Sequence, residues 1–496
     1  MRAPSVIDLL LGQAEARPEA PALEDSLGTK WNYADLKHAA DALSEVLGKE
    51  GVTAGDRVLI VSENCGAAVA ALFATWLIGA VAVPVNARQT AHELDRIIAH
   101  AAPHAVLLTS AVSSDAVAHS ARLNASETTG AWGALDLLCL PAPALDIDRD
   151  IAVILYTTGT TGDPKGVMLT QANVCFGGQT SANLRAMTPA DLIYGVLPTT
   201  HVFGLCSVVV AAIHAGAPVR LVPRFDVCAV YDGLRDGITL FSAVPQMHAL
   251  LMAHARANGL EALGSDTLRY VSSGAAPLDP TWKREAEAFY GVAIQNGYGM
   301  TESTAGTAAT RNLIGDLDTS VGPALPEIEI AIDQADAVDG VGEVLTRGPH
   351  VMRGYFRNKV ETARTIDAQG WLHTGDLGCI DGRGHLHIVG RAKELIIHGG
   401  FNVYPPEVEA ALNDHPDVVQ AAVIGRPFEG DEEVLAFVQV ARDSGLSADI
   451  LRTFVRDRLA GYKRPARYIL AQSLPAAPTG KVLKHKLIET FAAELA

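Results

Sequence analysis

The sequence has few cysteines, and no two of them lie close enough in the chain to form a recognised motif. Its six cysteines are scattered over 496 residues without a C-x-x-C motif. Several lie in apolar runs, where a free thiol behaves as a small hydrophobic side chain. This usage predicts a reducing compartment, and we expect the protein in the cytoplasm.

An excess of positive charge is also missing. The formal net charge is −17, whereas a nucleic-acid backbone requires a basic surface. We therefore expect no nucleic-acid partner and no docking on anionic lipid. The first residues reach Asp8, Glu15 and Glu19 too soon for a signal peptide, so none is expected.

Long apolar runs are rare, and the charge-free run at residues 66–85 needs a membrane test because its length could span a bilayer. The run is rich in alanine and glycine, and Gly79 and Pro84 interrupt it. We predict a helix ending near Gly79 and a buried strand at 81–85, with no transmembrane segment.

Strand and helix patterns alternate through the first part of the chain. Helices at 67–78 and 91–101 and strands at 81–85 and 104–108 predict parallel βαβ units. A second α/β run occupies residues 170–300. Residues 110–148 are rich in Ala, Ser and Thr, which predicts a loose connection between the two runs.

The remainder of the chain has a different character. From about residue 320, strand and turn patterns predict a small β-rich subdomain. A C-terminal unit with its own helices and strands follows from about residue 391. No internal repeat or low-complexity tail is present.

A loop rich in threonine and glycine follows the apolar run at 151–155. Residues 156–166 read Tyr-Thr-Thr-Gly-Thr-Thr-Gly-Asp-Pro-Lys-Gly. Glycines let backbone N–H groups approach an anion, which indicates phosphate binding; an ordinary polar surface loop is the alternative. The loop is not a Walker A motif, because Lys165 lies between Pro164 and Gly166. Pro164 disfavours helix at the preceding residue, so we expect an open loop.

Two further stretches suit a nucleotide. Residues 296–302 place Tyr298 between two glycines, which leaves a ring face for a planar base. They end in Thr301, a hydroxyl for phosphate, and Glu302, a hard oxygen ligand for Mg²⁺. Asp376 is expected after a tight turn, where its carboxylate could accept ribose hydroxyls.

Three stretches near the C-terminus are also polar where a core would be apolar. Arg391 offers a bidentate donor at the apparent domain junction. Gly399 and Gly400 indicate close approach of a ligand to the backbone, and Lys481 lies on a turn. Taken singly, these residues could be surface or turn residues. Taken together with the earlier stretches, they supply every contact that Mg-ATP needs.

The six motifs together resemble those of the acyl-adenylate-forming superfamily. That superfamily includes acyl- and aryl-CoA synthetases, adenylation domains of non-ribosomal peptide synthetases, and firefly luciferase. The resemblance covers nearly the whole chain and rests, in order, on residues 157–166, 298–302, 374–376, 390–394, 399–405 and 478–481. The compact bacterial acyl-CoA synthetases resemble the chain most.

This resemblance implies an α/β fold. Residues 1–390 would form a large AMP- and acyl-binding domain of two α/β subdomains plus a small β-rich subdomain. Residues 391–496 would form a small, mobile α+β domain that carries the adenylation lysine.

The resemblance also implies an ATP site, with Mg²⁺ held by Glu302. The catalytic residues would be Lys481, Thr301, Glu302 and His201. The nucleotide would be bound by Thr157, Thr158, Gly159, Thr160, Thr161, Gly162, Lys165, Gly274, Ala275, Asn296, Gly297, Tyr298, Gly299, Thr301, Asp376, Arg391 and Lys481.

The implied activity is that of an AMP-forming acid–CoA ligase, with ATP and CoA as co-substrates. The acyl pocket would be lined by His201, Phe203, Val244, Met247 and Ala276, the hinge would lie at Lys393, and the CoA tunnel would pass Gly399, Gly400 and Tyr404. The segments expected to line the pocket, 201–207, 241–250, 272–276 and 303–308, contain no Arg or Lys, which disfavours a dicarboxylate. We expect an aromatic or a short-to-medium aliphatic acid. Loading of a carrier protein instead of CoA is the alternative, and a homodimer is left open.

Overall fold

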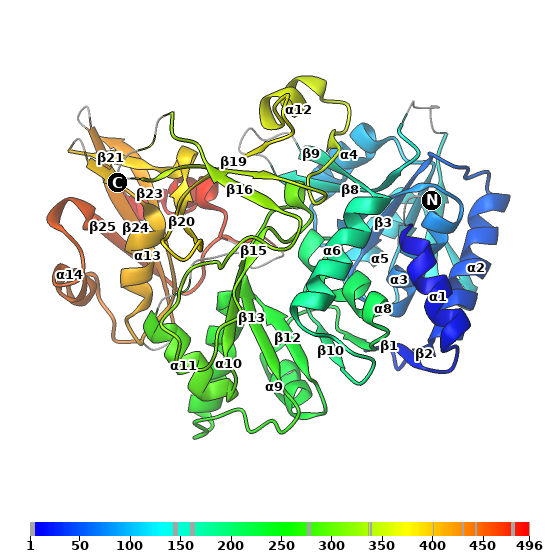
Figure 1. Cartoon of the computed structure of the whole chain (residues 1–496), viewed down its shortest axis with the longest axis horizontal. Coiled ribbons are helices and arrows are strands. Elements are labelled where there is room, and N and C mark those ends of the chain that lie inside the picture. The colour runs from blue at the N-terminus through cyan, green and yellow to red at the C-terminus, as the bar shows by residue number, and fades with distance from the viewer. Residues whose placement is uncertain are drawn as a thin grey trace.

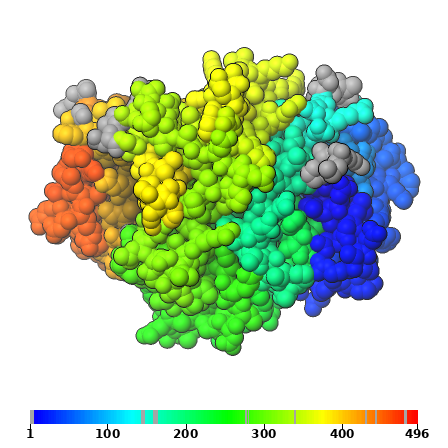
Figure 2. Space-filling model, viewed as in Figure 1, coloured from blue at the N-terminus to red at the C-terminus, as the bar shows by residue number. Residues whose placement is uncertain are grey.

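The computed structural model has the predicted mixed α/β architecture (Figure 1). It describes the chain except residues 1–4, 142–146, 159–163, 275–277, 279, 336, 338–339, 400, 429–430, 442–443, 478–481 and 496, and the side chain of Thr158. Helices α1 and α2 lie at one end of the molecule and the C-terminal elements at the other, as the space-filling view also shows (Figure 2).

The first eight-stranded sheet carries both flanks of the predicted phosphate loop. Its order is β18-β9-β8-β4-β3-β5-β7-β6, and β3, β4, β5 and β8 run parallel. Its strands are β3 (Arg57–Ser62), β4 (Val81–Asn86), β5 (Ala105–Leu108), β6 (Ser126–Gly130), β7 (Gly133–Cys139), β8 (Ile151–Thr158), β9 (Pro164–Thr170) and β18 (Gly354–Tyr355). Antiparallel pairing of β8 with β9 brings Thr157 opposite Lys165.

The second eight-stranded sheet ends in the segment that contains Tyr298. Its strands, in spatial order, are β15 (Ala308–Ala309), β14 (Ile294–Tyr298), β13 (Tyr270–Gly274), β12 (Leu240–Ala243), β10 (Ile193–Gly195), β11 (Val219–Leu221), β1 (Pro21–Asp25) and β2 (Lys30–Asn32). The N-terminal strands β1 and β2 thus complete the sheet of the second α/β run. The sequence did not predict this exchange, because strand pairing across such a separation leaves no local pattern.

Helices pack against both sheets. They are α1 (Val6–Ala16), α2 (Tyr33–Lys49), α3 (Gly66–Leu77), α4 (Ala91–Ala101), α5 (Ser114–Leu123), α6 (Gln171–Leu184), α7 (Val202–Gly204), the π-helix η1 (Leu205–Val210), α8 (Ala211–Ala215), α9 (Val227–Arg235), α10 (Pro245–Ala257) and α11 (Pro280–Tyr290). Helix α3 is buried on every side except at its end, which explains its lack of charge. In the part of the chain that is described, no helix is both long and apolar enough to cross a membrane.

A four-stranded antiparallel sheet forms the predicted β-rich part, with η2 (Thr301–Ser303) preceding it and α12 (Lys359–Thr365) inserted in it. Its order is β16 (Glu329–Ile332), β17 (Gly342–Arg347), β19 (Leu372–Ile380) and β20 (Leu386–Arg391).

The C-terminal part is an α+β unit. It contains η3 (Ala392–Glu394), β21 (Ile396–His398), β22 (Phe401–Val403), α13 (Pro405–Asn413), β23 (Val418–Phe428), β24 (Asp431–Val440), α14 (Ala448–Arg456), η4 (Gly461–Lys463), β25 (Arg467–Ala471), η5 (Lys484–Lys486), α15 (Leu487–Thr490) and α16 (Ala492–Leu495). It touches the preceding part through β23 against α10 and α13 against β20.

Two local predictions were wrong. Residues 110–148 are no loose connection, because α5, β6 and β7 occupy most of the segment and β7 pairs with β5. Asp376 does not follow a tight turn but lies inside β19, opposite Arg391. Gly375 has a φ of +70° within that strand, a conformation that glycines also adopt in tight turns, so the glycine before Asp376 predicted a turn.

A buried histidine sets an expected pH dependence of stability. Burial lowers the pKa of His248 from 6.5 to about 4, and burial also lowers the pKa of His350 to about 4. The neutral His248 ring lies 2.8 Å from the Tyr290 hydroxyl through Nδ1 and 3.3 Å from the Ser272 carbonyl through Nε2. The unfolded chain therefore binds more protons between pH 6.5 and 4 than the folded chain does.

We expect the free energy of unfolding to fall as pH drops through this window, by roughly 3 kcal/mol for His248. Urea unfolding of the wild type and of His248→Gln, each at pH 7 and pH 5, measures the contribution. His248→Gln should show a shallower loss, while His38→Gln at an exposed position of α2 should behave like the wild type. Equal pH slopes for all three proteins would contradict the assignment.

Candidate nucleotide and acyl site

Tyr298, Asp376 and Arg391 form one hydrogen-bonded group. The Tyr298 hydroxyl donates to Asp376 Oδ2 at 2.6 Å, and Arg391 Nε lies 3.0 Å from Asp376 Oδ1. Asp376 is buried, with 5% of its surface exposed. Burial and the Asp376 carboxylate raise the pKa of Tyr298 well above its usual value, so the phenol keeps its proton. Three residues that were predicted to bind the nucleoside therefore lie in direct contact.

Strand register explains this meeting. Asp376 on β19 faces Arg391 on β20, and its backbone N–H donates to Thr374 Oγ1 at 3.1 Å. Burial lowers the pKa of Arg391, but Asp376 and Glu394 outweigh burial and the net shift is upward. The guanidinium thus stays charged beside the carboxylate.

The backbone of β14 leaves room beside Tyr298. Gly297 pairs with Gly274 on β13, so neither strand carries a side chain at this paired position near its carboxyl end. Gly299 is required by packing, because a Cβ there would lie 1.6 Å from the Ala305 carbonyl oxygen. Asn296 is buried, and its amide donates to the Ser320 carbonyl at 3.0 Å, which fixes the strand end.

Thr301 and Glu302 follow on the short helix η2 and are both buried. The hydroxyl of Tyr355 donates to Glu302 Oε1 at 2.9 Å. Glu302 also contributes to the upward pKa shift of Arg391, which places its carboxylate in the field of the first group. The predicted metal and phosphate residues therefore adjoin the predicted ribose residues.

Lys165 lies on β9, at the end of the predicted loop. Its ammonium pairs with Glu361 on α12 and stands over the Tyr355 ring, 5.2 Å from the ring centroid. This pair lowers the pKa of Glu361. Tyr355 thus links Lys165 to Glu302, because its ring contacts the lysine and its hydroxyl contacts the carboxylate.

The residues predicted for the acyl pocket occupy the ends of α7 and α10. His201 caps α7, with Nδ1 accepting from Phe203 N at 3.3 Å. A Cβ on Gly274 would lie 3.0 Å from the Phe203 ring, so that ring lies against the end of β13. Val244 precedes α10, and Met247 within it is buried. Apart from His201, the described pocket residues are apolar, and Phe203 among them lies against β13.

The predicted hinge and CoA residues lie on the C-terminal side of this group. Lys393 is in η3, two residues after Arg391. Gly399 has a φ of +59°, and its N–H donates to Asp431 Oδ2 at 2.8 Å. Tyr404 precedes α13, and its ring lies 3.6 Å from the Cβ position of Gly390.

Several predicted residues fall outside the described part of the chain, and their roles remain predictions. They are Gly159, Thr160, Thr161, Gly162, Ala275, Ala276, Gly400 and Lys481, together with the side chain of Thr158.

Two site residues escaped the sequence reasoning. Tyr355 contacts Glu302, and its position directly after Gly354 repeats the glycine–tyrosine pattern that pointed to Tyr298. Asn64 donates to the Gly195 and Leu197 carbonyls at 3.0 and 2.9 Å and thereby fixes the segment that leads to His201. Nothing in the local sequence marked Asn64.

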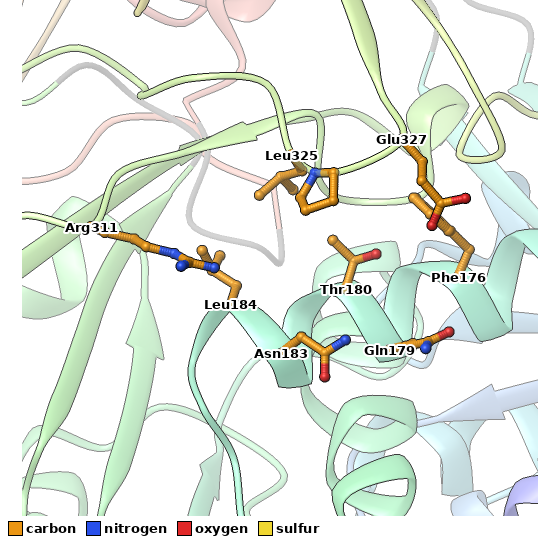
Figure 3. A pocket seen from close by; sticks show the side chains of 9 residues that line it. Phe176, Gln179, Thr180, Asn183, Leu184, Arg311, Leu325 and Glu327 are labelled. Atoms are coloured by element: carbon orange, nitrogen blue, oxygen red, sulfur yellow. The ribbon is translucent and has the colours of Figure 1, made fainter.

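A small cavity of about 80 Å³ lies apart from these residues (Figure 3). It is bounded by α6 and the segment 325–327, with Arg311 and Glu327 on opposite sides. None of the residues predicted for the nucleotide or the acyl group lines it: its lining is Phe176, Gln179, Thr180, Asn183, Leu184, Arg311, Leu325, Pro326 and Glu327.

Known proteins resemble this chain over its whole length. A feruloyl-CoA synthase from Amycolatopsis sp is 32% identical over 97% of each chain. A long-chain-fatty-acid–CoA ligase from Bacillus subtilis is 30% identical, covering 97% of this chain and 93% of the relative. Among solved structures, the O-succinylbenzoate coenzyme A synthetase of Bacillus subtilis in complex with ATP and magnesium ion is 28% identical, with a TM-score of 0.80 over 97% of this chain and 98% of that chain.

Two family models match in sequence order. Residues 10–356 match the AMP-binding enzyme model, and residues 407–481 match the AMP-binding enzyme C-terminal domain model. The predicted superfamily and fold class are thereby confirmed. The chain belongs to the AMP-binding enzyme family.

Proposed function

We propose that the protein is an AMP-forming acid–CoA ligase. It would activate a carboxylic acid with ATP to acyl-AMP and pyrophosphate, and then transfer the acyl group to the thiol of CoA. The observation that carries this proposal is the contact of Tyr298, Asp376 and Arg391 beside Glu302. Relatives that are named as CoA ligases over nearly the full chain support it.

In this proposal the polar group receives ATP. Tyr298 would lie against the adenine, and Asp376 with Arg391 would bind the ribose. Thr301 would contact the α-phosphate, while Thr157, Lys165 and the loop between them would hold the β- and γ-phosphates. The contacts among Tyr298, Asp376 and Arg391 support one nucleotide site. The link from Lys165 to Glu302 through Tyr355 supports its extension to the phosphates.

The donor set near Glu302 fits Mg²⁺. Within the described residues no group of three or more His, Cys, Asp or Glu is placed to hold a metal. Mg²⁺ is commonly bound by one or two carboxylates plus substrate phosphates and water, which one buried carboxylate satisfies. When bound, the ion would neutralise phosphate charge. The Tyr355 hydroxyl donates to Oε1 of Glu302 and so orients the carboxylate that would hold the ion.

The chain's own task is to bring a carboxylate and a triphosphate together. Both are anions, so positioning and charge compensation dominate the barrier. Arg391 supplies one fixed positive charge at the described site, and Lys481 would supply another at the reacting oxygens. A rotation about Lys393 would then remove Lys481 and bring Gly399 and Gly400 to the CoA path.

The substrate is proposed to be a compact acid, aromatic or short-to-medium aliphatic. Phe203, Val244 and Met247 give the acyl side an apolar lining. Packing limits its depth, because a Cβ on Gly177 of α6 would lie 3.0 Å from Thr304 and 3.3 Å from Cys206. A long tunnel between α6 and η1 would need this contact to open.

A carboxylic-acid panel tests the proposal. With ATP, Mg²⁺ and free CoA, AMP release should be greatest with aromatic acids such as ferulate or with hexanoate, and much lower with palmitate and malonate. Thioester formation with free CoA is expected. Pyrophosphate exchange without a CoA thioester would favour a carrier protein as acceptor, and the absence of exchange with every acid would reject the proposal.

Lys481 provides a second test. We expect Lys481→Ala to lower acyl-AMP formation by roughly 10²–10³-fold, because one charge-stabilising donor is removed from the reacting atoms. Thioester formation from supplied acyl-AMP should persist. The neighbouring Lys484→Ala, whose side chain pairs with Glu394 and Glu409, serves as a charge-matched comparison. Equal losses of both half-reactions in Lys481→Ala would contradict its role.

A further inference from the structure

Tyr355 joins two charged groups of the proposed site. Its hydroxyl donates to Glu302 Oε1 at 2.9 Å, and the Lys165 ammonium stands 5.2 Å from its ring centroid. Tyr355 is buried, with 6% of its surface exposed. One side chain thus contacts both the carboxylate and the lysine that are proposed to meet the phosphates.

The backbone around Tyr355 is fastened to both segments. Tyr355 pairs with Val167 on β9, and Phe356 N donates to the Gly166 carbonyl at 2.7 Å. On the other side, Met352 N donates to the Glu302 carbonyl at 2.9 Å. The segment 352–356 therefore fixes η2 relative to the strand that carries Lys165.

The state of the phenol suits a hydrogen-bond donor. Burial, followed by the Glu302 carboxylate, raises the pKa of Tyr355. A neutral hydroxyl has a single proton to donate, and in this structure Glu302 receives it. A hydrogen bond to a charged acceptor is among the stronger ones in proteins.

Lys165 is held on the ring by an acidic partner. Glu361 on α12 pairs with it, and Thr362, the next residue, accepts from the Tyr355 N–H at 2.9 Å. Helix α12 therefore holds the Tyr355 backbone through the Thr362 hydroxyl and the Lys165 ammonium through the Glu361 carboxylate. This arrangement places the ammonium without contact to Glu302 itself.

We propose that Tyr355 is a positioning residue for nucleotide binding, and this inference rests on the proposed function. Its hydroxyl donates to Oε1 of Glu302 and so fixes the orientation of the carboxylate that would hold the metal. Its ring supports Lys165 next to the same phosphates. The role differs from simple packing, since it depends on one hydroxyl oxygen.

Tyr355→Phe isolates that oxygen, because the ring and its packing remain. The control is Tyr33→Phe, at the first residue of α2 and away from the proposed site. It removes a buried hydroxyl that lies 3.4 Å from the Ala217 carbonyl. For each protein, calorimetry measures ATP binding with and without Mg²⁺. The Mg²⁺ midpoint of pyrophosphate exchange is measured in parallel.

We expect Tyr355→Phe to weaken Mg²⁺-dependent ATP binding and to raise the Mg²⁺ midpoint by about tenfold. Mg²⁺-free ATP binding should change much less, and Tyr33→Phe should match the wild type in both assays. Unchanged Mg²⁺ dependence in Tyr355→Phe would overturn the proposal.

A double variant guards against a general structural effect. In a Glu302→Gln background, Tyr355→Phe should have little further effect on Mg²⁺-dependent binding, because its partner carboxylate is gone. A full additional loss would overturn the proposal. Calorimetry needs neither acid nor CoA, so failure to form acyl-CoA would reject the proposed function while leaving this comparison intact.

Discussion

The buried carboxylate of Asp376 is the constraint on which the site depends. It receives the Tyr298 hydroxyl from β14 of one eight-stranded sheet and the Arg391 guanidinium from β20 of the four-stranded sheet. Burying a charge is unfavourable unless the charge is paired and hydrogen-bonded. Removing one partner therefore leaves the remaining charge buried without compensation. The same three side chains therefore join two sheets and gather the groups proposed to bind the nucleoside.

A second carboxylate, Glu302, is held by the same kind of contact. A tyrosine donates to each carboxylate, the partly buried Tyr298 to Asp376 and the buried Tyr355 to Glu302, and in both cases burial raises the pKa of the phenol. Such donors orient an acid without neutralising it. Each of the two acidic groups is therefore oriented by a phenol, and both contribute to the upward pKa shift of Arg391.

The sequence predicted the parts that local pattern controls. The charge-free run became α3 and β4, and the helix at 91–101 matched α4, which Thr90 caps through Glu93. Among the site residues that were named by motif, Tyr298, Asp376 and Arg391 lie in contact with one another. Residue types at fixed spacing carry this information, and Gly299 beside Tyr298 is also needed for packing.

Features set by distant contacts could not be predicted. Strand β7 is held by pairing with β5, and β6 by pairing with β7, although the Ser- and Thr-rich sequence of β6 has weak strand character. Asp376 looked like a turn residue because Gly375 adopts a positive φ inside β19. Tyr355 and Asn64 act through partners far along the chain, and no local spacing encodes such a partner.

The central claim is that Asp376 anchors a nucleotide site, and titration of AMP into the wild type and Asp376→Asn tests it most directly. Asp381→Asn, at the partly buried residue directly after β19, is the control, and thermal unfolding of each protein gives its folded fraction. We predict that folded Asp376→Asn binds AMP at least about tenfold more weakly, because a charged acceptor of hydrogen bonds is lost. Wild-type affinity in folded Asp376→Asn would contradict the account.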